Sequence, residues 1–438
     1  MRPRIWLATL VALLSVPAAA GAHAAPRGAV TNAGGAVRVE FTVPVENAFL
    51  QVRDAAGNTI PARVDGGDGH AVIVAPTAPG TRLRLRVLSR DGHVTYATVP
   101  AVAEPSSGRD PIDAILAHGL VLAGLVGMLG LVSLRFLVVG PAWRSGGPRP
   151  PGTGGVESWR QVTAQALVRG SGAWWIALWA SGAAAAAGLA LGPLALLREL
   201  DAGAGGLGTL IADTRWGRSW LVQLVGLAVG LAVAAALRSR PAAREPDPPR
   251  GWGLALGVPA AAALVGISIG SHASSGTDSG VGMGIDGIHL LATAAWFGGL
   301  LGLALAVPAA HRRLAESDGT RLAAAVVVRF SGLAIACVGV LVVTGVYRAI
   351  GELSAVGDLL HTGYGQALSV KLGLFAVLLA SGGYNRLVLH PRLERAALGL
   401  RESDGGAARR LRVSVLAELT VALGVIAAVA VLVSLPTP

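Results

Sequence analysis

The sequence predicts a mainly α-helical polytopic membrane protein, with about eight transmembrane helices and a small N-terminal all-β sandwich domain. Three observations predict this fold class. Hydrophobic residues make up 53% of the 438 residues and charged residues only 14%, which is too apolar for an ordinary soluble protein. Eight apolar segments are each long enough to cross a bilayer as a helix. A stretch near the N-terminus alternates apolar and polar residues with the period of a half-buried strand.

The first 22 residues have the layout of a secretory signal peptide. Arg2 and Arg4 precede an apolar core at residues 5–16, and small residues follow it. This core is too short to span a membrane comfortably. Cleavage after residue 22 fits the small-x-small rule and leaves His23 as the first residue of the mature chain. Cleavage after residue 20 and cleavage after residue 24 are alternatives, and the second of these removes His23.

Residues 23–103 are expected to form the β domain. Apolar residues alternate with polar ones from Val37 to Val43, and further short strands are expected at 49–53, 71–75, 83–88 and 94–99. Glycine-rich and proline-rich turn signals separate these segments. The pattern indicates a small sandwich with a thin core. Residues 104–111 form a polar linker.

The membrane domain is expected over residues 112–438, and the distribution of arginine orients it. The predicted helices are 112–139, 172–197, 217–237, 252–270, 285–308, 324–347, 366–389 and 413–435. Arginines concentrate in the connections after the first, third, fifth and seventh helices, whereas the alternate connections are acidic or nearly neutral. The positive-inside rule therefore places the arginine-rich connections in the cytoplasm, and both the N-terminal domain and the C-terminus outside. The signal peptide independently predicts the same orientation.

This orientation also explains the formal net charge of +11. The positive charge lies in the membrane-flanking connections, so the bilayer is the expected partner and nucleic acid is not. Lys371 is the only lysine, and this preference for arginine is typical of high-GC bacterial genes. We expect a multi-pass protein of a bacterial plasma membrane.

Three histidines at a similar outer depth are the candidate metal ligands of the membrane domain. The stretch 268–299 contains His272 and His289, and His118 lies in the first turns of the first helix. Two or three imidazoles suit copper. Asp286, one turn before His289, is a candidate to orient the metal-binding ring by accepting a hydrogen bond from it, and Met283 is a candidate soft ligand for Cu(I). The alternative for each histidine is a hydrogen bond to a neighbouring helix. The single cysteine, Cys337, excludes an intramolecular disulfide.

A second candidate site involves the outer domain. If His23 is the first residue, its free amine and imidazole together chelate Cu(II), and Asp91 with His93 of the segment SRDGH complete a roughly square-planar set of nitrogen and oxygen ligands.

These segments carry a family resemblance. The outer domain resembles the CopC copper-binding domain through His23 after the signal sequence, the strand VRVEFTVPVE, the turn VRDAAGN and the closing LRVLSRDGH. The membrane domain resembles the CopD copper-resistance family through GIDGIHLLATAAWFGGLLGLAL at 284–305, VVRFSGLAIACVGVLVVTGVYRA at 327–349 and TGYGQALSVKLGLFAVLLASGGYNRLVLHPRL at 362–393. The chain thus looks like a fused CopC–CopD protein, and the resemblance assigns His23, Asp91 and His93 to the Cu(II) site.

The resemblance implies copper import or copper tolerance, with the outer domain capturing Cu(II) and the membrane domain passing copper inward. Copper ions are the expected ligand, a periplasmic or cytoplasmic copper chaperone is a candidate partner, and the oligomeric state is open. No enzymatic activity is expected, and the sequence has no phosphate-binding loop for ATP. Two alternatives remain open at this point: a haem-binding electron-transfer protein, and a copper sensor or assembly factor that does not transport.

Overall fold

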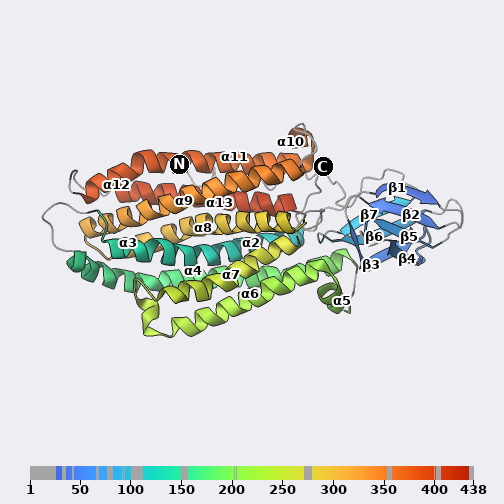
Figure 1. The fold of residues 1–438 in the computed structure, drawn as a ribbon, viewed down its shortest axis with the longest axis horizontal. Coiled ribbons are helices and arrows are strands. Elements are labelled where there is room, and N and C mark those ends of the chain that lie inside the picture. Colours follow the sequence, from blue (N-terminus) through green and yellow to red (C-terminus); the bar gives the residue numbers. More distant parts are fainter. Residues whose placement is uncertain are drawn as a thin grey trace.

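The computed structural model is an elongated molecule in which a helix bundle carries a β domain at one end (Figure 1). This confirms the predicted fold class. The structure describes residues 26–31, 36–41, 44–65, 69–75, 82–90, 92, 94–99, 112–148, 156–201, 203, 205–270, 279–352, 358–398, 400 and 406–433. The predicted signal peptide and linker lie outside these residues.

Two antiparallel sheets form the β domain. One sheet has the strand order β1-β2-β5-β4, and the other has the order β3-β6-β7. Side chains of strand β2 alternate between buried and exposed, as its sequence predicts. The core between the sheets is built around Val39, Phe41, Val72 and Val87. The strands are β1 (Pro26–Thr31), β2 (Val37–Phe41), β3 (Val45–Arg53), β4 (Ala62–Asp65), β5 (Ala71–Val74), β6 (Leu83–Ser89) and β7 (Val94–Val99).

Two of these strands, β1 and β4, were not predicted from the sequence. Both lie at the edges of the larger sheet. An edge strand needs only one hydrogen-bonded neighbour, so it tolerates proline and glycine and need not alternate strictly. The sequence of β1, PRGAVT, therefore lacks the period-two pattern by which the central strands were found.

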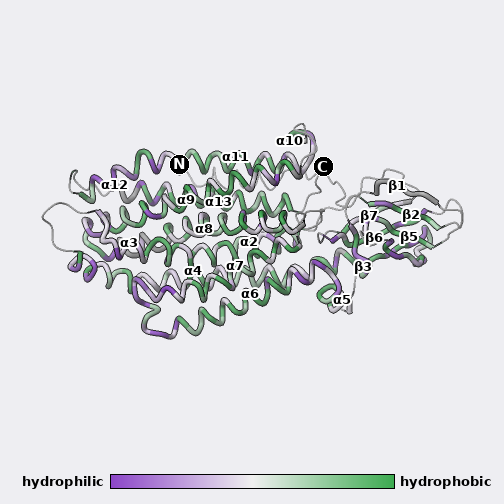
Figure 2. Tube along the Cα trace, viewed as in Figure 1, coloured by the Kyte–Doolittle hydropathy of each residue, from purple (hydrophilic) through white to green (hydrophobic). Residues whose placement is uncertain are grey.

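In the part of the chain that the structure describes, eight helices are long and apolar enough to cross a membrane, in agreement with the eight predicted segments. Their hydrophobic residues dominate the middle of the bundle, and hydrophilic residues gather toward its ends (Figure 2). The helical elements are α2 (Ile112–Ser133), η1 (Leu134–Val139), α3 (Gly140–Ser145), α4 (Val156–Glu199), α5 (Gly206–Asp213), α6 (Arg215–Arg238), η2 (Pro241–Arg244), α7 (Arg250–Ile269), α8 (Ser279–His311), α9 (Glu316–Glu352), α10 (Asp358–His361), α11 (Gly363–Tyr384), η4 (Asn385–Leu389), α12 (His390–Ala397) and α13 (Gly406–Val433).

Helix α4 begins sixteen residues before the predicted span, at Val156 instead of residue 172. The additional turns carry charged residues, so hydropathy does not reveal them. They are helical because one of their faces is apolar: Trp159 and Ala166 are buried against the bundle. The predicted segment corresponds to the part of α4 that is apolar all round.

Helix α2 lies at the centre of the bundle and contacts α4, α7, α8 and α13. All its residues from Gly124 to Val132 are buried. The close approach of α2 to α8 depends on glycine: a Cβ on Gly130 would overlap the backbone of Ala294 and Gly298. Small residues at such crossings allow van der Waals contact between helix backbones inside a membrane. The position of α2 fixes the position of His118 in its first turns.

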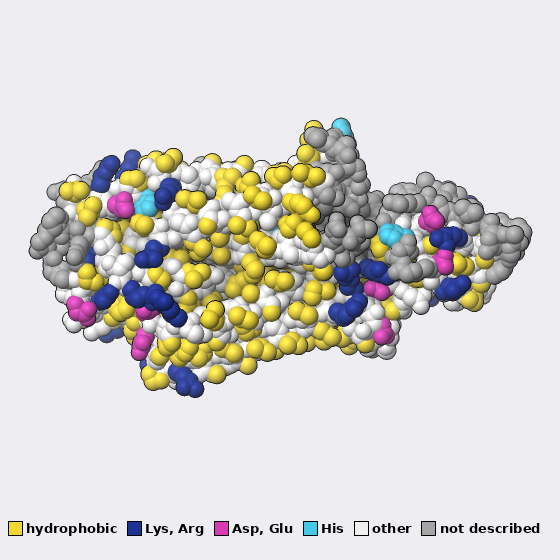
Figure 3. Space-filling view, in the orientation of Figure 1, with side chains coloured by type: hydrophobic (Ala, Val, Ile, Leu, Met, Phe, Trp, Pro, Cys, Tyr) yellow, Lys and Arg dark blue, Asp and Glu magenta, His cyan; other side chains and the backbone are white. Residues whose placement is uncertain are grey.

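The arginine-rich connections meet at the end of the bundle opposite the β domain, where arginines are visible in Figure 3. Arg144 forms an ion pair with Asp247 of the α6–α7 connection. Arg321 of α9 donates to the Gly146 carbonyl (3.0 Å), and Leu393 of α12 belongs to the apolar cluster of this end. The connections predicted to share one side of the membrane therefore lie together.

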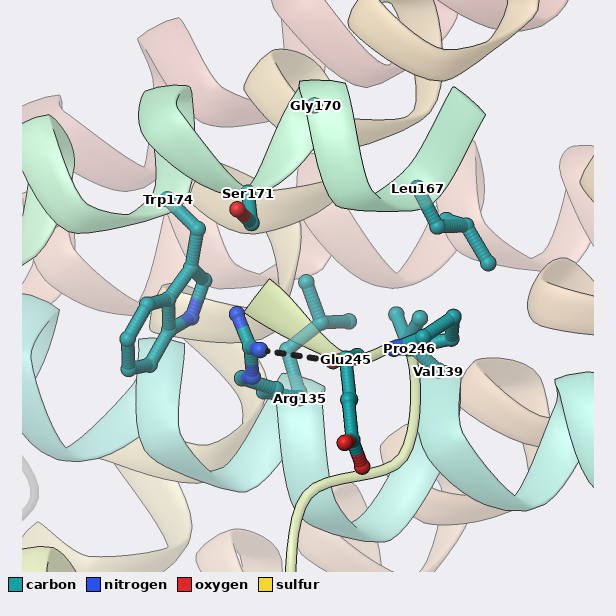
Figure 4. Close-up of a pocket in the computed structure, with 9 residues that line it drawn as sticks. Arg135, Val139, Leu167, Gly170, Ser171, Trp174, Glu245 and Pro246 are labelled. Carbon is teal, nitrogen blue, oxygen red and sulfur yellow. Dashed lines mark hydrogen bonds between the residues drawn. The ribbon is translucent and has the colours of Figure 1, made fainter. Parts of the chain in front are cut away.

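A small pocket of about 50 Å³ at this end is built around Arg135 (Figure 4). Pro141 lacks the N–H that would continue regular helical bonding, and just before it the chain forms the π-helix η1. Arg135 of η1 stacks over the Trp174 ring at 4.7 Å. Its guanidinium donates to the carbonyls of Ala243 (2.8 Å) and Glu245 (2.9 Å). These contacts connect α2, α4 and the α6–α7 connection.

Candidate functional site

The β domain is seated on the bundle through an apolar contact. Phe49, Leu88 and Val94 of the β domain form one buried cluster with leucines of α4 and α5. The ring of Trp216, in the first turn of α6, packs against the same cluster. Burial of these side chains gives the seating a hydrophobic driving force.

A glycine turn of the β domain touches α6 directly above the bundle. Gly92 has a φ of +90°, in the left-handed region that favours glycine. A Cβ at this position would lie 2.6 Å from Cδ1 of Trp216. In the sequence Gly92 stands between Asp91 and His93, two of the predicted Cu(II) ligands. Both the backbone conformation and the contact with α6 therefore require glycine here.

Beneath this turn lies a cavity of about 170 Å³ between the β domain and the bundle. We call it the junction cavity. Its wall is mostly apolar, and its polar lining comes from five side chains of α2, α6, α8 and α9. Ser219 and Gln223 are hydrogen bonded to each other (3.0 Å). The lining includes Gly92, Trp216 and Trp220 and the polar residues His118, Ser219, Gln223, Asp286 and Arg348.

His118 lines the junction cavity and is exposed. It lies in the first turns of α2, where the sequence places it, beside the cavity. Its Nδ1 atom is 2.9 Å from the Ala114 carbonyl oxygen. Because a carbonyl oxygen only accepts, Nδ1 carries the proton, and Nε2 carries the lone pair with which a neutral histidine binds a metal.

Asp286, the carboxylate predicted to orient His289, has a strong partner on another helix. The Asp286 carboxylate forms an ion pair with Arg348 of α9. Its side chain is 4% exposed and that of Arg348 is 27% exposed. A carboxylate so deeply buried requires a close positive charge, and Arg348 supplies it. The pair forms part of the wall of the junction cavity.

His289 is oriented by a hydroxyl group instead. Its Nδ1 atom lies 2.8 Å from Oγ1 of Thr344, and this hydroxyl donates to the Val340 carbonyl (2.7 Å). Oγ1 therefore accepts from Nδ1–H, and the lone pair is again on Nε2. Lys371 and Arg348 lie close enough for their positive charges to act on this ring.

The described members of the predicted membrane set, His118, His289 and Met283, do not lie in one cluster. Among the described residues, no group of three or more His, Cys, Asp or Glu side chains is arranged to hold a metal ion. His118 lines the junction cavity, whereas His289 is bonded to α9. Met283 lines a separate recess beside Arg215, whose Nη2 is 3.9 Å from its sulfur. The other predicted ligands, His23, Asp91, His93 and His272, lie outside the described residues.

Three residues of this region were not predicted from the sequence: Arg348, Thr344 and Trp216. Arg348 is the one that the sequence could have revealed, because it directly follows an apolar span, in a connection whose other charged residues, Glu352 and Asp358, are acidic. A charged residue at such a position calls for a partner. Which carboxylate serves as that partner depends on helix packing, and the sequence does not specify it.

Comparisons with known proteins relate the chain to copper-handling proteins. The family model of copper resistance protein D (CopD) matches residues 324–432. This part of the chain is similar to the CopD family. The CopD region contains α11, α12, almost all of α13 and most of α9, and therefore includes Thr344, Arg348 and Lys371. The predicted resemblance of the membrane domain is thereby confirmed.

The copper transport protein CutJ of Bacillus subtilis (strain 168) is 26% identical to the chain, over 100% of this chain and 78% of the relative. No solved structure matches the chain. The CopD match and this relative together assign the protein a copper-related function in a membrane.

Proposed function

We propose that this protein is a copper transporter, not an enzyme, that takes copper ions from the side of the β domain and passes them through the junction cavity toward the arginine-rich end. Copper is its transported substrate. The observation that supports the proposal is the junction cavity itself, because Gly92, the residue between Asp91 and His93 in the sequence, and His118 line the same cavity. The CopD match and the transport function of CutJ support copper as the ion.

The β domain acts as the capturing domain of CopC type, with His23, Asp91 and His93 as its Cu(II) ligands. Gly92 packs on Trp216 at the edge of the junction cavity, so copper released from this domain enters the cavity without crossing bulk solvent. His118 receives it there, since its Nδ1–H bond to the Ala114 carbonyl leaves the lone pair on Nε2. A neutral imidazole is a common copper ligand.

The ion pair of Asp286 and Arg348 controls the next step. A positive ion in the junction cavity is attracted by Asp286 and repelled by Arg348, and one carboxylate does not fully neutralise both. Copper therefore competes with Arg348 for Asp286. Displacement of the guanidinium opens the way toward His289, whose ring Thr344 orients with the same tautomer.

The proposed orientation places the β domain and the C-terminus outside a bacterial plasma membrane and the arginine-rich connections inside. The membrane potential then favours movement of a cation inward, by about 2.3 kcal/mol per charge at 100 mV. Import therefore needs no ATP site.

Copper accumulation in cells tests the proposal. We expect His118→Ala and His289→Ala each to lower the initial rate of copper uptake at equal membrane abundance. His361→Ala is the matched control, because His361 is an exposed histidine on α10, outside the cavity lining. Uptake by the two variants equal to that of the wild type would remove both residues from the route.

Three further measurements separate the alternatives. Stoichiometric copper binding with no uptake by the wild type would indicate a sensor or assembly factor. A Soret band in the spectrum of the purified protein would indicate haem. N-terminal sequencing tests the outer site, because a mature chain that begins at any residue other than His23 lacks the amine–imidazole chelate.

A further inference from the structure

A second recess lies beside the junction cavity, at the same end of the bundle. It is open, with a volume of about 710 Å³. Three arginines line it: Arg90 from the β domain, and Arg215 and Arg218 from the first turn of α6. Glu46 is the only carboxylate among its described lining residues. We call it the arginine recess, and arginines are visible near the junction with the β domain in Figure 3.

The described residues that line the arginine recess carry more positive than negative charge. Arg218 and Arg90 both repel the guanidinium of Arg215, and Glu46 attracts it. Oε1 of Glu46 also accepts a hydrogen bond from the Arg215 backbone N–H (3.2 Å). Arg90 and Arg218 form no ion pair with a carboxylate of the described residues. Among the described residues that line the recess, three arginines thus accompany one carboxylate.

Two features of the surroundings increase this imbalance. Arg215 and Arg218 occupy the first turn of α6, where the helix dipole disfavours cations. Other arginines at this end of the bundle have carboxylate partners: Arg198 lies 3.3 Å from Asp113, and Arg348 is paired with Asp286. An anion in the arginine recess would relieve both the mutual repulsion and the unfavourable helix dipole.

The shape of the arginine recess indicates what kind of anion fits. Leu221 and Val222 line its bundle side, and both are 38% exposed. They lie three and four residues after Arg218, on the same face of α6. A guanidinium above exposed aliphatic side chains, at the start of a membrane-spanning helix, matches a ligand with a charged head and an apolar tail.

We propose that the arginine recess binds the phosphate group of an anionic phospholipid, with the acyl chains lying along Leu221 and Val222. Guanidinium groups bind phosphate oxygens through paired hydrogen bonds. Because Arg90 belongs to the β domain and the other two arginines to α6, a phosphate between them joins the two domains. The bound lipid therefore holds the β domain over the junction cavity, and this role does not depend on copper.

Lipid binding to the purified full-length chain in lipid-free detergent tests the proposal. The probes are dioleoyl phosphatidylglycerol, dioleoylglycerol, which has the same chains without phosphate, and inorganic phosphate. Each arginine near a membrane surface contributes on the order of a 5-fold gain in affinity. We therefore expect Arg90→Gln/Arg218→Gln to bind phosphatidylglycerol about 25-fold more weakly. The control Arg238→Gln/Arg240→Gln, at the opposite end of α6, is expected to bind like the wild type.

Each outcome decides the proposal. Equal affinity of the recess variant and the wild type would refute it, and so would equal binding of dioleoylglycerol. Saturation of the site by millimolar inorganic phosphate, with no advantage for the lipid, would indicate an adventitious anion site. If the double variant is not recovered, Arg218→Gln serves alone, since this side chain is exposed, with about a 5-fold loss expected.

A second readout examines the junction of the two domains. In wild type, phosphatidylglycerol is expected to slow amide hydrogen exchange in the β-domain segments around Phe49 and Leu88, which face the bundle. In Arg90→Gln/Arg218→Gln it is expected to leave that exchange unchanged. Equal protection in both proteins would show that the lipid does not act between the two domains.

Discussion

Replacement of Arg348 by glutamine is expected to destabilise the protein more than replacement of its partner, Asp286, by asparagine. The two side chains form one ion pair, but their surroundings differ. Asp286 is 4% exposed, whereas Arg348 is 27% exposed and borders the junction cavity. Arg348→Gln leaves a carboxylate enclosed by protein. Asp286→Asn leaves a guanidinium beside a cavity large enough for several water molecules.

The expected magnitudes follow from this difference. Removal of one partner from a buried ion pair costs about 3–5 kcal/mol when the charge left behind is enclosed. The partial exposure of Arg348 places the cost of Arg348→Gln near the lower limit, about 3 kcal/mol. Asp286→Asn should cost about 1 kcal/mol, as for a pair whose remaining member reaches water. The double variant Asp286→Asn/Arg348→Gln should be more stable than Arg348→Gln alone, because it has no unpaired buried charge.

Thermal or denaturant unfolding of the four proteins in the same detergent measures these differences. The order of stability is the decisive result, because it does not depend on the absolute scale. If Arg348→Gln proves as stable as Asp286→Asn, the assignment of Asp286 as the enclosed member of the pair is wrong. A double variant no more stable than Arg348→Gln would show that the two side chains act independently.

Two further predictions concern the turn above the cavity and the opposite half of the bundle. Gly92→Ala should lower both stability and copper uptake, because alanine there combines a positive φ with an overlap on Trp216. Gly57→Ala is the control, since Gly57 has a φ of +89° but open space around it. This control should lose only about 1–2 kcal/mol of stability, which is what a positive φ costs a residue with a Cβ. Glu418→Leu should lower the unfolding midpoint and Glu418→Gln should not, because Ser381 and Asn385 both donate to the Glu418 carboxylate. Glutamine keeps an acceptor for these two donors, whereas leucine leaves them without one, which costs about 1–3 kcal/mol of stability. Equal unfolding midpoints of the two variants would contradict this reasoning.

Features that depend on neighbouring residues in the chain could be predicted from the sequence. A membrane span is recognisable because some twenty consecutive residues must be apolar, and the eight predicted spans are present. The central strand β2 was found because one of its faces is buried and the other exposed. Elements stabilised mainly by their neighbours in space were missed: the edge strands β1 and β4, and the polar first turns of α4.

The candidate site was less predictable because its partners come from different helices. Asp286 and His289 are one helical turn apart, and this spacing suggested that they interact. In the folded chain each bonds instead to α9, Asp286 to Arg348 and His289 to Thr344. Similar depth in the membrane likewise did not imply contact, since His118 lines the junction cavity whereas His289 bonds to Thr344 of α9. Residue spacing gives the face and depth of a side chain, and packing determines what it contacts.

The charges around His289 indicate how this residue takes part in transport. Lys371 and Arg348 both act on its ring, so a copper ion bound to Nε2 is repelled by Lys371 and, less strongly because Asp286 pairs with it, by Arg348. A neutral ligand in such a field binds a cation weakly and releases it readily, which suits a step on a route and not a storage site. We therefore expect His289→Ala to lower the rate of copper uptake and to leave the amount of copper bound at equilibrium unchanged. Metal analysis of the purified variant, dialysed against buffered copper, measures the second quantity. Loss of a full equivalent of bound copper would show that His289 is a high-affinity ligand and that neighbouring groups offset the two positive charges.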